Sequence, residues 1–101
     1  MFQLVLQFAP WDSERFDDLI ALEERLIAAV GRRASVDGHD AGSGEGNIFL
    51  LTDYPTEVLR DCIPVVQQSA LRGFTAGYRR LDADDYQRVW PQGDRSPFIV
   101  K

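Results

Sequence analysis

The strongest constraint on the fold is the large apolar residue at every second position of residues 2–8. Because successive side chains of a β-strand point to opposite faces, this period of two predicts a strand that buries one face. The buried face would carry large apolar side chains, which are Phe2, Leu4, Leu6 and Phe8. The opposite face is half polar, with Val5 between Gln3 and Gln7.

The first predicted helix covers residues 13–30, where apolar residues recur at helical spacing. Ser13 or the aspartate before it provides an N-cap, and Gly31 ends the helix. Glu23 lies inside the apolar stripe, where an unpaired carboxylate is costly to bury. We expect its side chain to reach solvent at an edge, to pair with an arginine such as Arg80, or to line a pocket.

Residues 34–38 and 47–52 predict two further strands. The first is short and polar, whereas the second is apolar on both faces and is therefore expected in the centre of its sheet. The glycine-rich residues between them predict a hairpin connection. A second helix is predicted from about Pro55 to Leu71, with Pro64 on its outer face and bending it around the core.

The last third of the chain predicts a strand over residues 76–81, a turn at 82–85 and a short strand over 86–90. Residues 98–100 are expected either to add an edge strand or to pack on the body. The order of elements is that of a ferredoxin-like α+β sandwich (βαββαβ) with a short C-terminal β extension. We expect one domain over residues 1–101, with two helices on one face of an antiparallel sheet. The first and third strands would lie centrally, and the second and fourth at the edges.

The composition argues against several classes of protein. A net charge of −5 does not suit a general nucleic-acid binder, which needs a basic surface against the phosphates. No apolar run is long enough to cross a bilayer, and no secretion signal precedes the first strand, so we expect a cytoplasmic protein without a membrane partner. The single cysteine, Cys62, lies on an apolar helical arc, which favours a buried and inert thiol.

The middle of the chain, residues 37–47, holds the densest group of chemically active side chains. The candidate ligand-binding residues are Asp37, His39, Asp40, Ser43 and Glu45. Imidazole and carboxylate groups suit zinc, manganese or iron, but one histidine does not make a tight zinc site. The spacing of a calcium-binding loop is also missing. We therefore predict no resident metal and no cofactor.

Other chemistries on this segment are also incomplete. Its glycines could present backbone amides to an anion, but phosphate loops lead into a helix and these glycines lead into a strand. Ser43, His39 and Asp37 are a formal nucleophile, base and acid, yet a flexible hairpin does not hold the geometry of attack. The glycines are better explained as turn residues. The ring of His39 is expected to bond Asp37, Asp40 or Glu45 and fix the hairpin.

Aromatic residues near the ends of elements and on the late strands form a second group. They would serve either as an exposed recognition surface or as packing at the core and its rim, and packing is the favoured interpretation. The residues are Trp11, Tyr54, Tyr78, Tyr86 and Trp90.

Residues 38–49 read Gly-His-Asp-Ala-Gly-Ser-Gly-Glu-Gly-Asn-Ile-Phe, with Thr52-Asp53 after them and Val89-Trp-Pro91 near the C-terminus. Over most of its length the chain resembles, in these motifs, a family of small uncharacterised bacterial proteins built on a ferredoxin-like scaffold. The resemblance implies a bacterial source, that fold and the hairpin as a defining feature. It carries over no catalytic residue.

Two classes of function follow. The favoured one is a non-enzymatic, acidic protein-interaction module that binds a basic partner, in the way that immunity proteins neutralise nuclease toxins. The alternative is a small-molecule or metal-binding protein, or an enzyme, centred on the 37–47 hairpin. Under the first hypothesis the half-polar face of the sheet must be covered, and a homodimer is the simplest cover. The predicted interface consists of Gln3, Val5, Gln7, Phe49 and Leu51.

Overall fold

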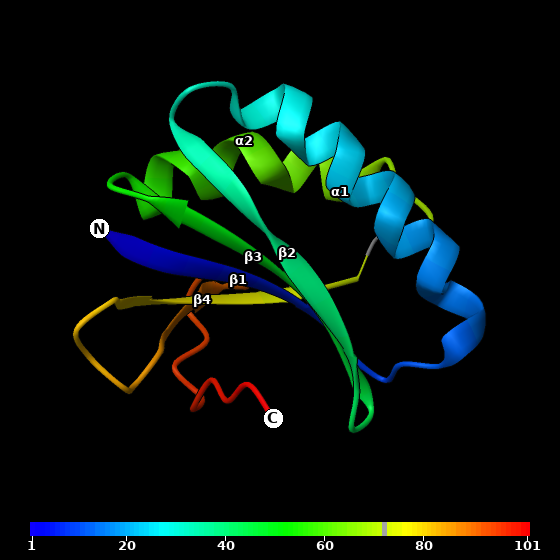
Figure 1. Cartoon of the computed structure of the whole chain (residues 1–101). Coiled ribbons are helices and arrows are strands. Elements are labelled where there is room, and N and C mark those ends of the chain that lie inside the picture. Colours follow the sequence, from blue (N-terminus) through cyan, green and yellow to red (C-terminus); the bar gives the residue numbers. More distant parts are fainter. Residues whose placement is uncertain (72) are drawn as a thin grey trace.

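The computed structural model describes residues 1–71 and 73–101, which form an antiparallel sheet with two α-helices packed on one face (Figure 1). The five strands are β1 (Phe2–Phe8), β2 (Ala34–Gly42), β3 (Glu45–Thr52), β4 (Thr75–Arg80) and β5 (Gln87–Trp90). The helices are α1 (Phe16–Val30), which follows a short 3-10 turn η1 (Ser13–Arg15), and α2 (Pro55–Gln67). The predicted α+β class is confirmed.

The strand order across the sheet is β2-β3-β1-β4-β5. β1 and β3 are central, as their apolar sequences predict. The prediction that the fourth strand is an edge is wrong, because the short strand after it, β5, turns back and pairs antiparallel with β4. The sheet therefore has five strands where a ferredoxin-like sheet has four, and its two edges are β2 and β5.

The hydrophobic core lies between the sheet and the two helices. Leu4, Leu6 and Phe8 of β1 are fully buried there, as the sequence predicts, whereas Phe2 at the start of the strand is only half-buried. The helices contribute the apolar residues that recur at helical spacing, which are Leu19, Leu22, Leu26, Val30, Val58, Leu59, Cys62 and Val66. Burial without a charged partner raises the pKa of the Cys62 thiol to about 12, so the thiolate is disfavoured.

The ends of the helices follow local chemistry. Gly31, with φ of 59°, ends α1 where the sequence predicts. α2 ends at Gln67, earlier than predicted, because Ser69 forms a local turn in place of a further helical turn. The Ser69 hydroxyl donates to the carbonyl of Val66 at 2.6 Å and accepts from the amide of Leu71 at 3.0 Å.

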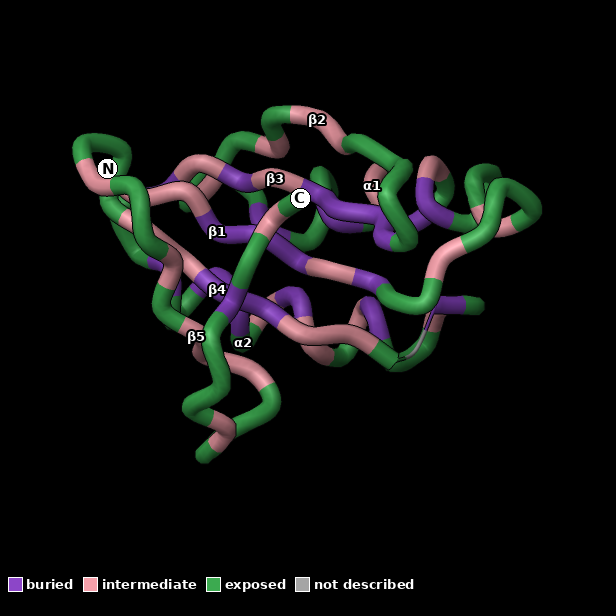
Figure 2. Tube along the Cα trace, turned by 90° about the horizontal axis from the view of Figure 1, so that it is seen from below, coloured by how far each residue is buried: buried purple, intermediate pink, exposed green. Residues whose placement is uncertain are grey.

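The opposite face of the sheet, here called the open face, is crossed by the C-terminal segment, residues 96–101 (Figure 2). Phe98 is only 4% exposed, and its ring lies where a side chain on Gly77 of β4 would be. A single β-bridge joins Phe98 to Tyr86. The segment therefore packs on the body, the second of the two arrangements expected for it, and it helps to bury Val5 beneath it.

Candidate functional site

The β2–β3 hairpin is closed by a turn of only two residues, Ser43 and Gly44. Both have positive φ, 54° for Ser43 and 81° for Gly44. Positive φ at both positions is the mark of a type I′ turn, whose twist matches that of paired strands, so pairing continues up to the turn. The predicted hairpin is confirmed, but its connection is shorter than the predicted residues 39–46, because residues 39–42 belong to β2 and residues 45–46 to β3.

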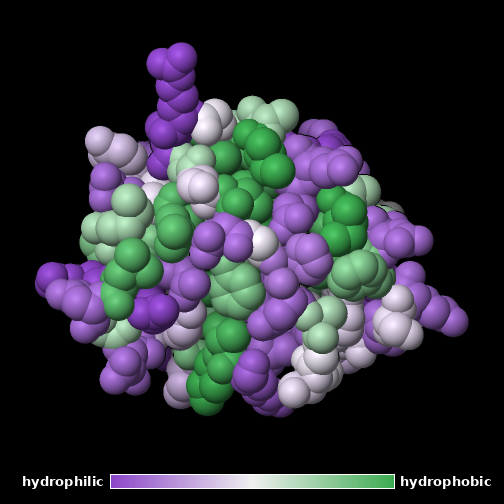
Figure 3. Space-filling view, in the orientation of Figure 1, coloured by the Kyte–Doolittle hydropathy of each residue, from purple (hydrophilic) through white to green (hydrophobic). Residues whose placement is uncertain are grey.

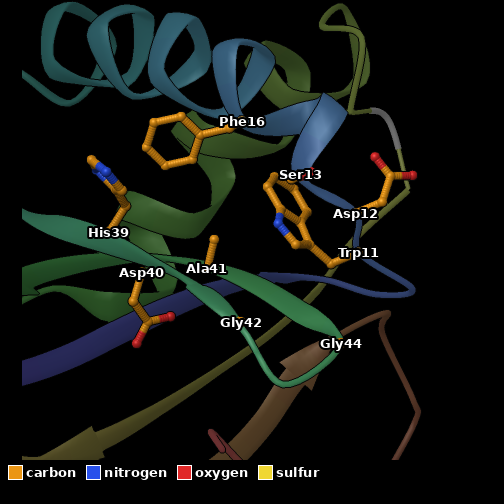
Figure 4. A pocket seen from close by; sticks show the side chains of 9 residues that line it. All are labelled: Trp11, Asp12, Ser13, Phe16, His39, Asp40, Ala41, Gly42 and Gly44. Carbon is orange, nitrogen blue, oxygen red and sulfur yellow. The ribbon is translucent and has the colours of Figure 1, made fainter.

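Strand alternation sends the candidate ligand-binding residues to different faces of the sheet. His39 points toward the helices, whereas Asp40 points away from them (Figure 4). Glu45 lies on the open face with Asp40, because both bond the amide of Asn47. Asp37 is exposed at the β-bulge of β2, where the register with β3 shifts. The five residues do not converge on one ligand.

This arrangement bears on the metal and nucleophile hypotheses. Within residues 1–71 and 73–101 no group of three or more histidine, cysteine, aspartate or glutamate side chains is placed to hold a metal ion. Ser43 stays at the tip of the turn and is exposed. His39 takes a partner from another element instead of Asp37, Asp40 or Glu45, so the predicted bonds within the hairpin are wrong.

That partner is Glu23 of α1. The Nδ1 atom of His39 lies 3.0 Å from the Oε2 atom of Glu23, and because a carboxylate only accepts hydrogen bonds, the ring nitrogen donates. The two side chains are 26% and 17% exposed. Arg80, suggested by the sequence as a partner for Glu23, pairs with Asp82 instead. Packing of α1 over β2 brings the histidine and the glutamate together.

Glu45 belongs to a different group, a polar network on the open face. Its Oε2 atom accepts from the side-chain amides of Gln7 and Asn47, both at 2.9 Å, and from the backbone amide of Lys101 at 3.2 Å. Gln7 also donates to the carbonyl of Ile99 at 2.9 Å. Glu45 is 5% exposed and Asn47 is fully buried. The network holds the C-terminal segment on the sheet. Glu45, a candidate ligand-binding residue in the sequence, therefore has a structural contact with this segment.

The predicted dimer interface is partly occupied by the chain itself. Val5 is fully buried, and Gln3 accepts hydrogen bonds from Arg79 and Tyr86. Phe49 and Leu51 remain half-buried on the same face.

A groove of about 760 Å³ opens between the tip of the hairpin and the start of α1. We call it the hairpin groove. Figure 4 shows the rings of Phe16, His39 and Trp11 around it and the methyl group of Ala41 pointing into it from β2. The lining residues are Trp11, Asp12, Ser13, Phe16, His39, Asp40, Ala41, Gly42 and Gly44.

Two aromatic residues shape the hairpin groove. Phe16 is 41% exposed, and its ring meets the His39 ring edge to face with 5.5 Å between the ring centroids. Trp11 lies against Gly46 of β3, where a Cβ atom would come within 2.7 Å of the indole. The guanidinium of Arg15 lies 5.6 Å from the indole centroid and donates to the carbonyl of Pro10 at 3.1 Å. Only glycine at position 46 therefore lets Trp11 close this end of the groove.

The charged side chains around the hairpin groove are mostly acidic. Residues 11–18 and 37–44 carry six exposed carboxylates, and Arg15 is the one arginine or lysine of these two stretches. The exposed carboxylates belong to Asp12, Glu14, Asp17, Asp18, Asp37 and Asp40. Asp12 also caps η1 by accepting from the amide of Glu14 at 3.0 Å.

The aromatic residues singled out in the sequence do not form one surface. Tyr78 packs on Phe2, Tyr86 on Phe98 and Trp90 on Phe74, so packing accounts for these three. Tyr54 is exposed, and Trp11 alone of the set lines the hairpin groove. The sequence does not distinguish Phe16 from the core residues, because it fits the apolar stripe of the helix, but in the structure it lies on the first turn of α1 and is exposed. Figure 3 shows the apolar side chains of this side of the molecule in separate clusters divided by polar ones.

Comparison with protein-family profiles, with curated proteins and with solved structures gives no match for this chain. None of the helices in the described residues is both long enough and apolar enough to span a membrane.

Proposed function

We propose that this protein is a non-enzymatic, acidic interaction module that binds a basic partner protein at the hairpin groove. One observation carries the proposal, namely an accessible aromatic groove within the acidic surface formed by residues 11–18 and 37–44. Aromatic side chains supply most of the binding energy of many interfaces, and complementary charge speeds encounter and selects the partner. The net charge of −5 favours a basic partner in the same way.

We also propose a ferredoxin-like scaffold, extended by β5. The order β2-β3-β1-β4 within the sheet supports this assignment, as do α1 and α2 packed on the same face. Membership of the bacterial family that the 38–49 motif resembles, and a cytoplasmic location, are proposals that rest on the sequence.

Capture of partners by matched surface variants tests the proposed function. Ala41→Arg places a bulky cation in the groove at an exposed strand position, and Asp85→Asn removes an exposed carboxylate from the β4–β5 turn. Both variants should keep the melting temperature of the wild type. We expect a basic protein from the source organism to be retained by the wild type and by Asp85→Asn, released by salt and lost with Ala41→Arg. Equal capture by all three proteins would contradict the proposal.

Self-association through the open face is a separate proposal, supported by the half-buried Phe49 and Leu51. Light scattering should give a dimer for the wild type and a monomer for Leu51→Lys. A monomer at high concentration for both would mean that the C-terminal segment already provides the necessary cover.

The alternative function, a small-molecule site, has one favourable observation. Glu23 orients the ring of His39, which lines the hairpin groove beside Phe16. Thermal unfolding in the presence of divalent metals, phosphates, nucleotides and small carboxylates would reveal such a site. Saturation at a hundred times the dissociation constant adds about 2.7 kcal/mol. A ligand shift that disappears in His39→Ala would favour this alternative over the interaction module.

A further inference from the structure

The edge strand β2 runs along one side of the hairpin groove and pairs with no strand other than β3 in the described part of the chain. An edge strand presents backbone amides and carbonyls that can pair with another strand. The register shift at Asp37 leaves residues 38–42 as the part of the edge next to the turn. Gly38 and Gly42 at its two ends have φ of 115° and 154°, so the regular strand backbone within it is residues 39–41. His39, Asp40, Ala41 and Gly42 of this stretch also line the groove.

The geometry points to a mode of recognition, in which an extended segment of the basic partner adds to the sheet beside residues 38–42 of β2. This inference rests on the proposed function and names the kind of segment that would bind. In such a complex the main-chain hydrogen bonds give affinity, and pockets for alternate side chains give specificity.

The side chains of β2 that point into the groove differ in chemistry from those that point to the open face. This difference determines which residue types should alternate along the bound segment. Ala41 points into the groove between Phe16 and Trp11, so a side chain added beside it would meet aromatic surface. Asp40 points to the open face and is exposed, so the neighbouring side chain of the segment would meet a carboxylate. Because an added strand alternates in step with β2, the segment should alternate apolar and basic residues.

A peptide experiment tests this mode directly. The probe is a capped eight-residue peptide that alternates arginine and valine, and the control is a block peptide of the same composition. We expect the alternating peptide to bind more tightly and to slow amide hydrogen exchange within residues 38–42. Asp40→Asn should weaken its binding about two- to fivefold, as expected for an exposed charge pair. Ala41→Arg should abolish binding, and Asp85→Asn should leave it unchanged.

Backbone methylation separates strand pairing from simple charge attraction. Alternate amides of a strand point to opposite sides, so methylating all valine nitrogens or all arginine nitrogens blocks one edge of the peptide at a time. We expect one of these two peptides to lose binding and the other to keep it. Equal binding by both, or by the block peptide, would overturn strand addition.

Failure of this inference is distinguishable from failure of the proposed function. Strand addition is wrong if a basic protein is captured in a manner sensitive to Ala41→Arg while the alternating peptide does not bind at millimolar concentration. The proposed function then stands with a different mode of contact. Strand addition by a basic partner is also wrong if the peptide protects β5 in place of β2, or if the added strand proves to be a second copy of this chain. If the wild type captures no basic protein and does not bind the alternating peptide, the proposed function and strand addition are both wrong.

Discussion

Gly77→Ala is a small change with a large expected effect, because the C-terminal segment lies directly over this glycine. An ideal Cβ atom at position 77 would come within 2.5 Å of the Phe98 ring and 3.1 Å of the carbonyl oxygen of Gln87. The ring is fixed on its other sides, by Tyr86 at 5.5 Å between centroids and by the guanidinium of Arg88 at 5.3 Å. Phe98 must therefore leave its place when the methyl group is added.

The magnitude follows from the burial of Phe98, which is 4% exposed. Burying a phenylalanine side chain stabilises a protein by about 1.5 to 3 kcal/mol, and displacement of the ring forfeits that amount. For a domain of this size the loss corresponds to a fall in melting temperature of roughly 6 to 24 °C. Phe98→Ala should cost a similar or somewhat larger amount, because it removes the same contacts.

Urea unfolding of four proteins checks this reasoning, namely the wild type, Gly77→Ala, Phe98→Ala and the double variant. If the Phe98 ring is the obstacle, Gly77→Ala should be nearly neutral in the Phe98→Ala background, within about 0.5 kcal/mol. Gly73→Ala is the matched control, because a Cβ atom there meets nothing within 4 Å. An equal cost of Gly77→Ala in both backgrounds would show that the Phe98 ring is not the obstacle. The added methyl group would then clash with the carbonyl oxygen of Gln87 instead.

Three further predictions concern the turn, the polar network and the thiol. Ser43→Gly should raise the free energy of unfolding by about 0.5 to 1 kcal/mol, since φ of 54° disfavours serine; destabilisation in a urea titration would contradict this. Glu45→Ala removes the acceptor that Gln7, Asn47 and the backbone amide of Lys101 share and should cost about 2 to 3 kcal/mol, and a neutral result by thermal unfolding would show that water replaces the carboxylate. Cys62, whose pKa is raised to about 12 by burial, should react with iodoacetamide only once urea unfolds the protein; labelling of the native protein would mean that α2 opens locally.

Much of the fold could be predicted because its signals are local. The alternation in β1, the helical spacing of α1 and the glycine at its end each depend on residues close together in the sequence. The extent of the β2–β3 hairpin was harder to predict from the sequence. Its glycines indicate a turn, but nothing local distinguishes a long loop from strands that stay paired up to Ser43 and Gly44. For that reason the sequence does not show that the paired strands send His39 and Asp40 to opposite faces.

The class of fold, the central place of β1 and β3, the burial of Cys62 and the net charge of −5 all follow from the amino-acid sequence. The contacts between residues far apart in the sequence became visible only in the folded chain. Glu23 meets His39 because α1 packs over β2, Phe98 covers Gly77, and Phe16 and Trp11 face Ala41 across the hairpin groove. Periodicity and turn chemistry act over a few residues, whereas these contacts depend on strand register and helix placement. Those are set by the packing of the whole core.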